Sequence, residues 1–222
     1  MPKTEKRVGV LLAGCGFLDG AEIHEATCTL LSLDRRGATA IVLAPDVPQM
    51  HVVDHGSGAA VAGEPRNVLA ESARIARGQA RDVASVHGSE LDALILPGGY
   101  GAAKNLCSFA RDGLSMRVVP EVERLIHEVH AAGKPLGFIC ISPVIAAKVL
   151  GGKGVTLTIG NDPETAAAIQ SFGAKHVACG VDEIAVDERL KVVSTPAYML
   201  GPSIAPVAAG IDRLVSAVLE MA

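Results

Sequence analysis

The chain has 222 residues, of which 49% are hydrophobic but only 3% aromatic, and its formal net charge at pH 7 is −4. This length allows one α/β domain with a core of Val, Ile, Leu and Ala, the residues that parallel sheets favour. The slightly acidic balance, without a basic run, argues against nucleic-acid binding.

Apolar segments with strand character alternate with amphipathic helical segments along the chain. This alternation predicts an α/β fold with a mainly parallel sheet, helices on both faces and a short antiparallel hairpin, in one domain over residues 1–222. Residues 45–63 are the least regular and suggest an excursion over the strand ends. Strands are expected at residues 8–13, 39–44, 91–96, 136–139, 155–159 and 176–178, the hairpin at 183–186 and 191–194, and helices at 21–36, 67–77, 119–132, 163–172 and 203–219.

Two features of the sequence bear on the compartment. Five cysteines without a CxxC pair favour free thiols in a reducing environment. The run Leu12-Ala-Gly-Cys15 after a basic start is similar to a lipoprotein cleavage box, but the apolar stretch before it falls short of the ~7–15 residues of a signal peptide. No apolar run approaches the ~20 residues that span a bilayer. We therefore expect a cytoplasmic protein that does not bind membranes.

Cys140 is the most informative single residue. It directly follows the predicted strand 136–139 and precedes a helix that begins near Ser142. This spacing is typical of a nucleophile elbow with Cys in place of Ser, and the positive end of the helix is expected to lower the pKa of the thiol. The alternative is a buried cysteine that fills a small apolar space.

Three unusual segments come together at the carboxyl ends of the predicted strands, where open α/β sheets bind ligands. They are the Gly-rich residues 14–20, the loop Pro97-Gly98-Gly99, and Cys140. Gly98 and Gly99 allow the backbone to approach a ligand, and the N–H groups of Gly99 and Ile141 are candidates for an oxyanion hole. An ordinary glycine-rich turn is the alternative.

Glu22 is the candidate acid–base residue, because it opens the first helix at this edge of the sheet. We expect its carboxyl group to hydrogen-bond the Cys140 sulfur and to be protonated at neutral pH, since two adjacent negative charges repel. The alternative is a solvated or helix-capping glutamate.

The sequence predicts neither a cofactor nor a bound metal. Gly14-x-Gly16-x-x-Asp19 departs from the dinucleotide pattern at Asp19, and no acidic residue follows the second strand at the usual spacing. His127 and His130 are spaced as a helical pair, but no metal-ligand motif surrounds them, so we expect an exposed pair.

Several motifs resemble the ElbB branch of the ThiJ/PfpI superfamily, which has the class-I glutamine amidotransferase-like fold. The resemblance implies a flavodoxin-like three-layer sandwich, a homodimer, and a glyoxalase activity that converts glyoxal into glycolate without glutathione or metal. An older label links this branch to isoprenoid biosynthesis. The motifs are Asp19-Gly-Ala-Glu-Ile-His-Glu25, Pro97-Gly-Gly-Tyr-Gly-Ala-Ala-Lys-Asn105, Gly133-Lys-Pro-Leu-Gly-Phe-Ile-Cys140, Leu157-Thr-Ile-Gly160, Thr195-Pro-Ala-Tyr-Met-Leu200 and Gly210-Ile-Asp-Arg-Leu-Val215.

Matched residue by residue, the resemblance implies that Cys140 is the nucleophile and Glu22 its acidic partner. It also implies that the backbone N–H groups of Gly99 and Ile141 bind the oxyanion. Peptidase- and amidotransferase-like relatives often have His directly after the Cys, where this chain has Ile141. Both of those activities need a base beside the nucleophile, so the departure weakens them.

We therefore expect an enzyme that acts on small dicarbonyl substrates through a Cys140 hemithioacetal. The alternative is a non-enzymatic redox or stress-response protein in which Cys140 oxidises reversibly. Cys15 is a candidate resolving thiol, if its strand lies close to that of Cys140; the alternative is a small residue in a tight turn.

Overall fold

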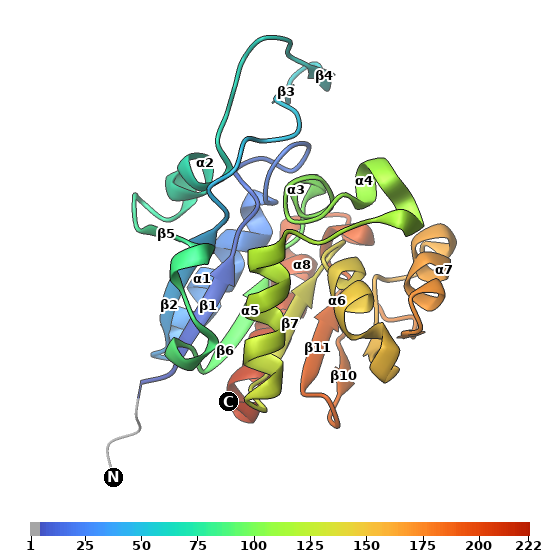
Figure 1. The fold of residues 1–222 in the computed structure, drawn as a ribbon. Helices are drawn as coiled ribbons and strands as arrows, with labels where there is room; N and C mark the ends of the chain where they lie inside the picture. Colours follow the sequence, from blue (N-terminus) through green and yellow to red (C-terminus); the bar gives the residue numbers. More distant parts are fainter. Residues whose placement is uncertain (1–4) are drawn as a thin grey trace.

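The computed structural model describes residues 5–222, and a seven-stranded sheet lies at its centre (Figure 1). The strand order is β10-β11-β7-β6-β1-β2-β5, and every neighbouring pair is parallel except β10 and β11. The predicted α/β flavodoxin-like fold with a short antiparallel hairpin is confirmed. The strands are β1 (Arg7–Leu11), β2 (Thr39–Ala44), β5 (Ala80–Asp82), β6 (Ala93–Leu96), β7 (Leu136–Ile139), β10 (Ala185–Asp187) and β11 (Val192–Thr195).

The direction in which the chain adds strands reverses between β1 and β6. From β1 the chain continues outward to β2 and β5, and from β6 it continues in the opposite direction to β7 and β11. Val10 of β1 pairs with Val42 on one side and Ile95 on the other. Such a reversal opens a crevice at the carboxyl ends of the strands, where ligands bind in this class of sheet.

Helices cover both faces of the sheet, which makes three layers (Figure 1). Helices α1 (Ile23–Arg35) and α8 (Ile204–Met221) pack on one face, and α5 (Pro120–Ala131) and α6 (Pro143–Leu150) pack on the other. Alternate residues of β1 serve the two cores, since Val10 lies in the α1/α8 core and Leu11 in the α5/α6 core.

The loops that surround the carboxyl ends of the strands carry the shorter elements. Residues 45–66 extend away from the sheet and contain a two-stranded hairpin (Figure 1). The backbone N–H of Val53 donates to the buried carboxylate of Asp19 (2.7 Å), which ties this segment to the loop after β1. The shorter elements are α2 (Val68–Ile75), α3 (Tyr100–Asn105), α4 (Phe109–Asp112), α7 (Pro163–Ser171), the hairpin β3 (Val53–Asp54) and β4 (Ala59–Ala60), the pair β8 (Thr156–Leu157) and β9 (Lys175–His176), and the 3₁₀ turns Val83–Ser85, Gly88–Glu90, Gly113–Ser115, Gly151–Lys153 and Ala197–Met199.

Two parts of the sequence prediction differ from the structure. The strands expected at 155–159 and 176–178 shrink to β8 and β9, which pair with each other outside the main sheet. The edge strand β5 and the short helices α3 and α4 were not predicted, because segments of three to six residues are too short to show a hydrophobic period.

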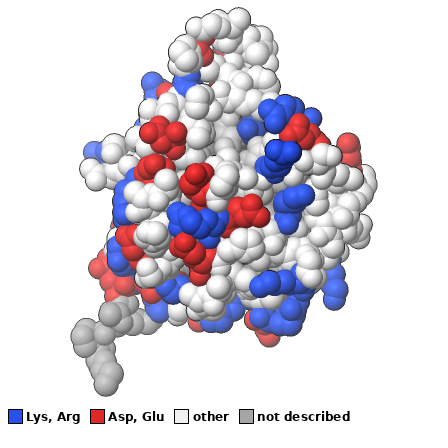
Figure 2. Space-filling view, in the orientation of Figure 1, with Lys and Arg blue, Asp and Glu red and all other residues white. Residues whose placement is uncertain are grey.

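The surface carries charges of both signs. Figure 2 shows acidic and basic side chains interspersed over the face that α5 covers, while the projecting segment at the top is mostly uncharged. No helix within residues 5–222 has the length and apolar character that crossing a bilayer requires.

Candidate active site

Cys140 lies on a strained turn between β7 and α6, as the elbow pattern predicts. Its backbone φ is +62°, a value that non-glycine residues seldom adopt and that is found often at functional sites. Its N–H donates to the carbonyl of Thr195 on β11 (2.9 Å). The turn places the Cys140 side chain at the base of a cavity, although the residue is only 7% exposed.

A buried serine holds this turn, and the sequence did not single it out. The Ser142 hydroxyl donates to the carbonyl of Leu96 (2.8 Å) and accepts the N–H of Ile139 (2.8 Å). It therefore links the ends of β6 and β7 directly beneath the nucleophile. A serine before Pro143 is an ordinary signal for the start of a helix, so this second use could not be read from the motif.

The acid that contacts Cys140 is Glu25, one helical turn after the residue that we predicted. Glu25 is fully buried, its carboxyl group lies beside the Cys140 sulfur, and its carboxylate accepts the N–H groups of Gly98 (2.9 Å) and Tyr198 (3.3 Å). Glu22 is instead the N-cap of α1, where its carboxylate accepts the N–H of Glu25 (2.7 Å). Glu25, rather than Glu22, is thus the acid whose carboxyl group lies beside the Cys140 sulfur.

The pattern of buried residues along α1 could have identified Glu25 from the sequence. The buried side of α1 carries Glu25, Ala26, Thr29, Ser32 and Leu33. Residues three and four apart share a helix face, so Glu25 lies on the face that packs against the sheet. Glu22 precedes the helix and lies at the cavity wall instead.

Burial sets the protonation of the pair. Burial, and secondarily the charge of Glu22, raises the pKa of Glu25 to about 8. Burial and the Glu25 carboxylate raise the pKa of Cys140 above its ordinary value, while the N–H groups of Gly99 and Ile141 oppose that rise. Our expectation of a lowered Cys140 pKa was wrong, because the helix terminus does not offset complete burial beside a carboxyl group. Both pKa values lie above neutral pH, and two adjacent negative charges repel, so the pair keeps at least one of its two protons at neutral pH.

Both predicted glycines are required sterically. A Cβ atom on Gly98 would lie 2.4 Å from the Cβ of Cys140, and one on Gly99 would lie 2.4 Å from the N atom of Glu22. Gly99 also has a φ of +90°. The N–H of Gly98 is used by Glu25, whereas those of Gly99 and Ile141 point at the sulfur, where an oxyanion hole needs donors.

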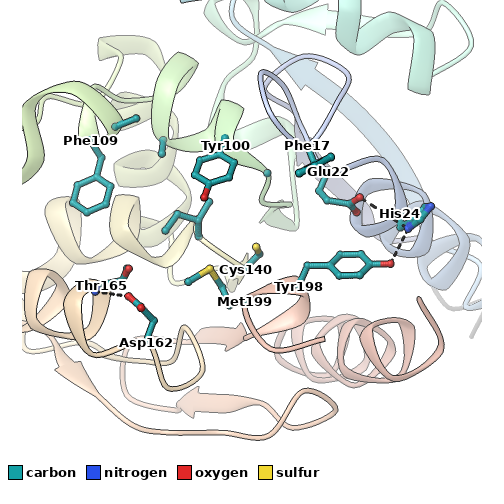
Figure 3. Close-up of a pocket in the computed structure, with 14 residues that line it drawn as sticks. Phe17, Glu22, His24, Tyr100, Phe109, Cys140, Asp162, Thr165, Tyr198 and Met199 are labelled. Carbon is teal, nitrogen blue, oxygen red and sulfur yellow. Dashed lines mark hydrogen bonds and ion pairs between the residues drawn. The ribbon is translucent and has the colours of Figure 1, made fainter. Parts of the chain in front are cut away.

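The cavity above Cys140 has a volume of about 730 Å³ (Figure 3). Glu22, His24 and Tyr198 lie at one end, where the Nδ1 of His24 is 2.7 Å from the Tyr198 hydroxyl and 4.0 Å from the Glu22 carboxylate (Figure 3). Both Glu22 and His24 therefore face the cavity. The other lining residues are Phe17, Gly99, Tyr100, Ala103, Phe109, Ala110, Ile141, Asp162, Thr165 and Met199.

The loop after β1 pairs its polar groups internally. Gly16 N–H donates to Ala21 O (2.9 Å), and Gly20 N–H donates to Gly16 O (2.6 Å). Cys15 is half-buried in this loop and is absent from the cavity wall; burial, and next the charge of Glu71, raises its pKa. The structure thus places Cys15 among the charges of α2, and its resolving role stays a prediction. Within residues 5–222, no three His, Cys, Asp or Glu side chains are grouped closely enough to hold a metal ion.

No model of a known protein family matches the chain. It is 50% identical to the Homo sapiens glutamine amidotransferase-like class 1 domain-containing protein 3, mitochondrial, over 100% of this chain and 85% of that protein. It is 37% identical to the ES1 protein, mitochondrial, of Danio rerio over 86% of this chain and 76% of that protein. These relatives are mitochondrial by name, which contradicts the cytoplasmic location that we expected. Free cysteines do not distinguish the cytoplasm from other reducing compartments.

Solved structures agree with the fold. A crystal structure of an isoprenoid biosynthesis protein with amidotransferase-like domain from Ehrlichia chaffeensis is 38% identical, with a TM-score of 0.91 over 97% of this chain and 99% of that one. A DJ-1 superfamily protein from Salmonella typhimurium is 23% identical, with a TM-score of 0.55 over 97% and 91%, and shares the fold. The chain therefore belongs to the family of glutamine amidotransferase-like class 1 domain proteins that includes the mitochondrial ES1 proteins.

Proposed function

We propose that this protein is an ElbB-type glyoxalase, which converts glyoxal-type dicarbonyls into hydroxy acids with Cys140 as nucleophile and no cofactor. The observation that carries the proposal is the buried pair of Glu25 and Cys140 beneath an open cavity. A carboxyl group with a pKa of about 8 can both give and take a proton near neutral pH, as acid–base catalysis requires.

In the first step the Cys140 sulfur bonds to one aldehyde carbon, and the proton of the pair moves to the aldehyde oxygen. The product is a hemithioacetal. The N–H groups of Gly99 and Ile141 lie beside the sulfur and are suited to stabilise the charge on that oxygen as it forms.

In the second step the Glu25 carboxylate removes the proton from the sulfur-bearing carbon, which gives an enediolate. After a proton moves between the two oxygens, Glu25 returns its proton to the neighbouring carbon, which leaves a thioester. Water then cleaves the thioester and releases glycolate and the Cys140 thiol. One carbon is oxidised and its neighbour reduced, so glyoxal and water balance glycolic acid without an external oxidant.

The surroundings of Cys140 weigh against a hydrolytic Cys–His dyad. Ile141 follows the nucleophile, and His24, the histidine on the cavity wall, hydrogen-bonds Tyr198. Glutaminase and peptidase chemistry would need a base such as histidine at the sulfur. We also propose a homodimer, as the ElbB resemblance implies.

The test is conversion of ¹³C-labelled glyoxal into glycolate, followed by NMR, with Cys140→Ser and the matched control Cys179→Ser. Cys179 lies outside the cavity wall. Glycolate formation that requires Cys140 but not Cys179 supports the proposal. Absence of glycolate with the wild-type protein refutes it.

A second candidate is a redox-responsive protein, and the same pair favours it. A protonated Glu25 and the N–H groups of Gly99 and Ile141 surround the Cys140 sulfur with donors that suit sulfinate oxygens. Peroxide treatment followed by peptide mass spectrometry separates the candidates: sulfinic acid at Cys140 without any turnover of glyoxal favours the redox role.

A further inference from the structure

The cavity is far larger than glyoxal, which has only two carbons and two oxygens. Its volume of about 730 Å³ falls in the range of roughly 300–1,000 Å³ that suits drug-sized ligands. Resting on the proposed function, we infer that the substrate is an uncharged α-oxoaldehyde whose ketone carbonyl bears a bulky apolar group, either an aryl ring or a branched alkyl chain.

The end of the cavity away from Glu22 and His24 carries aromatic and apolar side chains, with Asp162 and Thr165 of α7 beside them (Figure 3). Phe109 of α4 lies at this end, Tyr100 and Met199 lie between it and Cys140, and Cys140 lies between the two ends (Figure 3). Ala110, the next residue of α4, also lines the cavity. A substrate with its aldehyde at Cys140 would direct its apolar group toward Phe109. Burial of an aryl group there is expected to improve kcat/KM by at least about 10-fold over glyoxal.

The charges around the cavity select against anions. Its wall carries two carboxylates, Glu22 and Asp162, and among the described residues no lysine or arginine lines it. Hydrogen bonds with Thr165 lower the pKa of Asp162, so this carboxylate stays charged at neutral pH.

The N-terminus of α7 lies at the Phe109 end of the cavity, and a helix N-terminus attracts anions (Figure 3). Asp162 caps it, and its carboxylate accepts the Thr165 N–H (2.8 Å). The protein's own carboxylate therefore occupies the position that a substrate carboxylate or phosphate would need, which excludes oxoacids and sugar phosphates as good substrates.

The experiment compares kcat/KM for glyoxal, phenylglyoxal and 4-carboxyphenylglyoxal. We expect phenylglyoxal to exceed glyoxal at least about 10-fold and the carboxylated compound to fall about 10-fold below phenylglyoxal. Equal values for glyoxal and phenylglyoxal, or no penalty for the carboxylate, overturn the inference while leaving the proposed function intact.

Two variants test the assignment to named residues. Ala110→Trp should lower the ratio of kcat/KM for phenylglyoxal over glyoxal, whereas Leu114→Trp, exposed on the neighbouring turn and outside the cavity wall, should leave that ratio unchanged. Asp162→Asn keeps a helix cap but removes the negative charge. It should therefore reduce the difference in kcat/KM between phenylglyoxal and 4-carboxyphenylglyoxal. A ratio that responds equally to Ala110→Trp and Leu114→Trp contradicts the assignment.

If no aldehyde is turned over, the proposed function fails and binding decides the inference separately. Ligand-observed NMR with acetophenone and 4-acetylbenzoate measures recognition without chemistry. Binding of acetophenone alone, weakened by Ala110→Trp, supports the cavity assignment. Equal binding of both compounds, or of neither, overturns it.

Discussion

The carboxyl group of Glu25 lies beside the sulfur of Cys140, although one residue belongs to α1 and the other to the turn after β7. Gly98 and Tyr198 fix the carboxyl group from two further segments. The segments that follow β6, β7 and β11 thus each contribute one residue to the surroundings of the Glu25 carboxyl group, and Glu25 itself follows β1.

Glutamine substitutions at the two glutamates separate their roles. Glu25→Gln keeps a neutral hydrogen-bonding group but cannot carry a proton, so we expect kcat for glyoxal to fall about 100-fold or more. Glu22→Gln is the matched control, since Gln still accepts the N–H of Glu25, and we expect a loss of less than about 10-fold. A larger loss for Glu22→Gln would return the acid–base role to the residue that the sequence suggested.

The pKa of Glu25 predicts how stability depends on pH. The unfolded chain releases this proton near pH ~4.3, but the folded protein keeps it up to about pH 8. The stability from this proton is therefore fully present below the unfolded pKa and is lost as pH rises through the folded pKa.

Thermal or denaturant unfolding of the wild type and Glu25→Gln across this pH window provides the measurement. The wild-type free energy of unfolding should decline relative to the variant by a few kcal/mol, because other groups cancel in the difference. A constant difference across the window would show that Glu25 titrates as an ordinary carboxyl group.

Substitution of Gly98 should damage the site through sterics alone. In Gly98→Ala the new Cβ meets the Cys140 Cβ at 2.4 Å and the Glu25 carboxylate at 2.9 Å. We expect a destabilisation of ~1–3 kcal/mol with loss of turnover. Gly152→Ala is the control, because its Cβ would meet nothing within 4 Å. Equal stability of the two variants would mean that the turn at Cys140 can shift to accommodate the new methyl group without cost.

Ser142 should matter for the elbow without contacting substrate. Ser142→Ala leaves the buried Leu96 carbonyl and Ile139 N–H without their partner, which is expected to cost ~1–3 kcal/mol of stability. Ser216→Ala is the control, because Ser216 is half-buried and its hydroxyl donates to the Glu220 carboxylate at the surface of α8. The urea midpoint should fall for Ser142→Ala and stay near the wild-type value for the control. An unchanged midpoint for Ser142→Ala would contradict the role of Ser142 in linking β6 and β7.

The sequence predicted the layers and the elbow well, because both depend on local patterns. Buried apolar runs mark β1, β6 and β7, and Cys140 directly follows one of them. The short strands β8 and β9 were predicted in part, but their separation from the main sheet depends on tertiary packing that no local pattern encodes.

The site was predicted less completely than the fold. Glu22 and Glu25 are both acidic residues at the start of one helix, and only their burial distinguishes them. The direction of the Cys140 pKa was missed for the same reason, since it depends on burial and on the neighbouring carboxyl group. Tyr198 reaches the site from the turn after β11, far away in the sequence.

The most direct test of the Glu25–Cys140 pair is to trap its covalent intermediate. The protein is mixed with glyoxal, quenched with acid, which slows the breakdown of hemithioacetals and thioesters, and analysed at acidic pH by peptide mass spectrometry in the wild type, Glu25→Gln and Cys140→Ser. We expect a transient adduct on Cys140 in the wild type, accumulation of that adduct in Glu25→Gln, and none at this position in Cys140→Ser. Adducts distributed over other cysteines, or an adduct on Cys140 that decays equally fast in Glu25→Gln, would contradict this expectation.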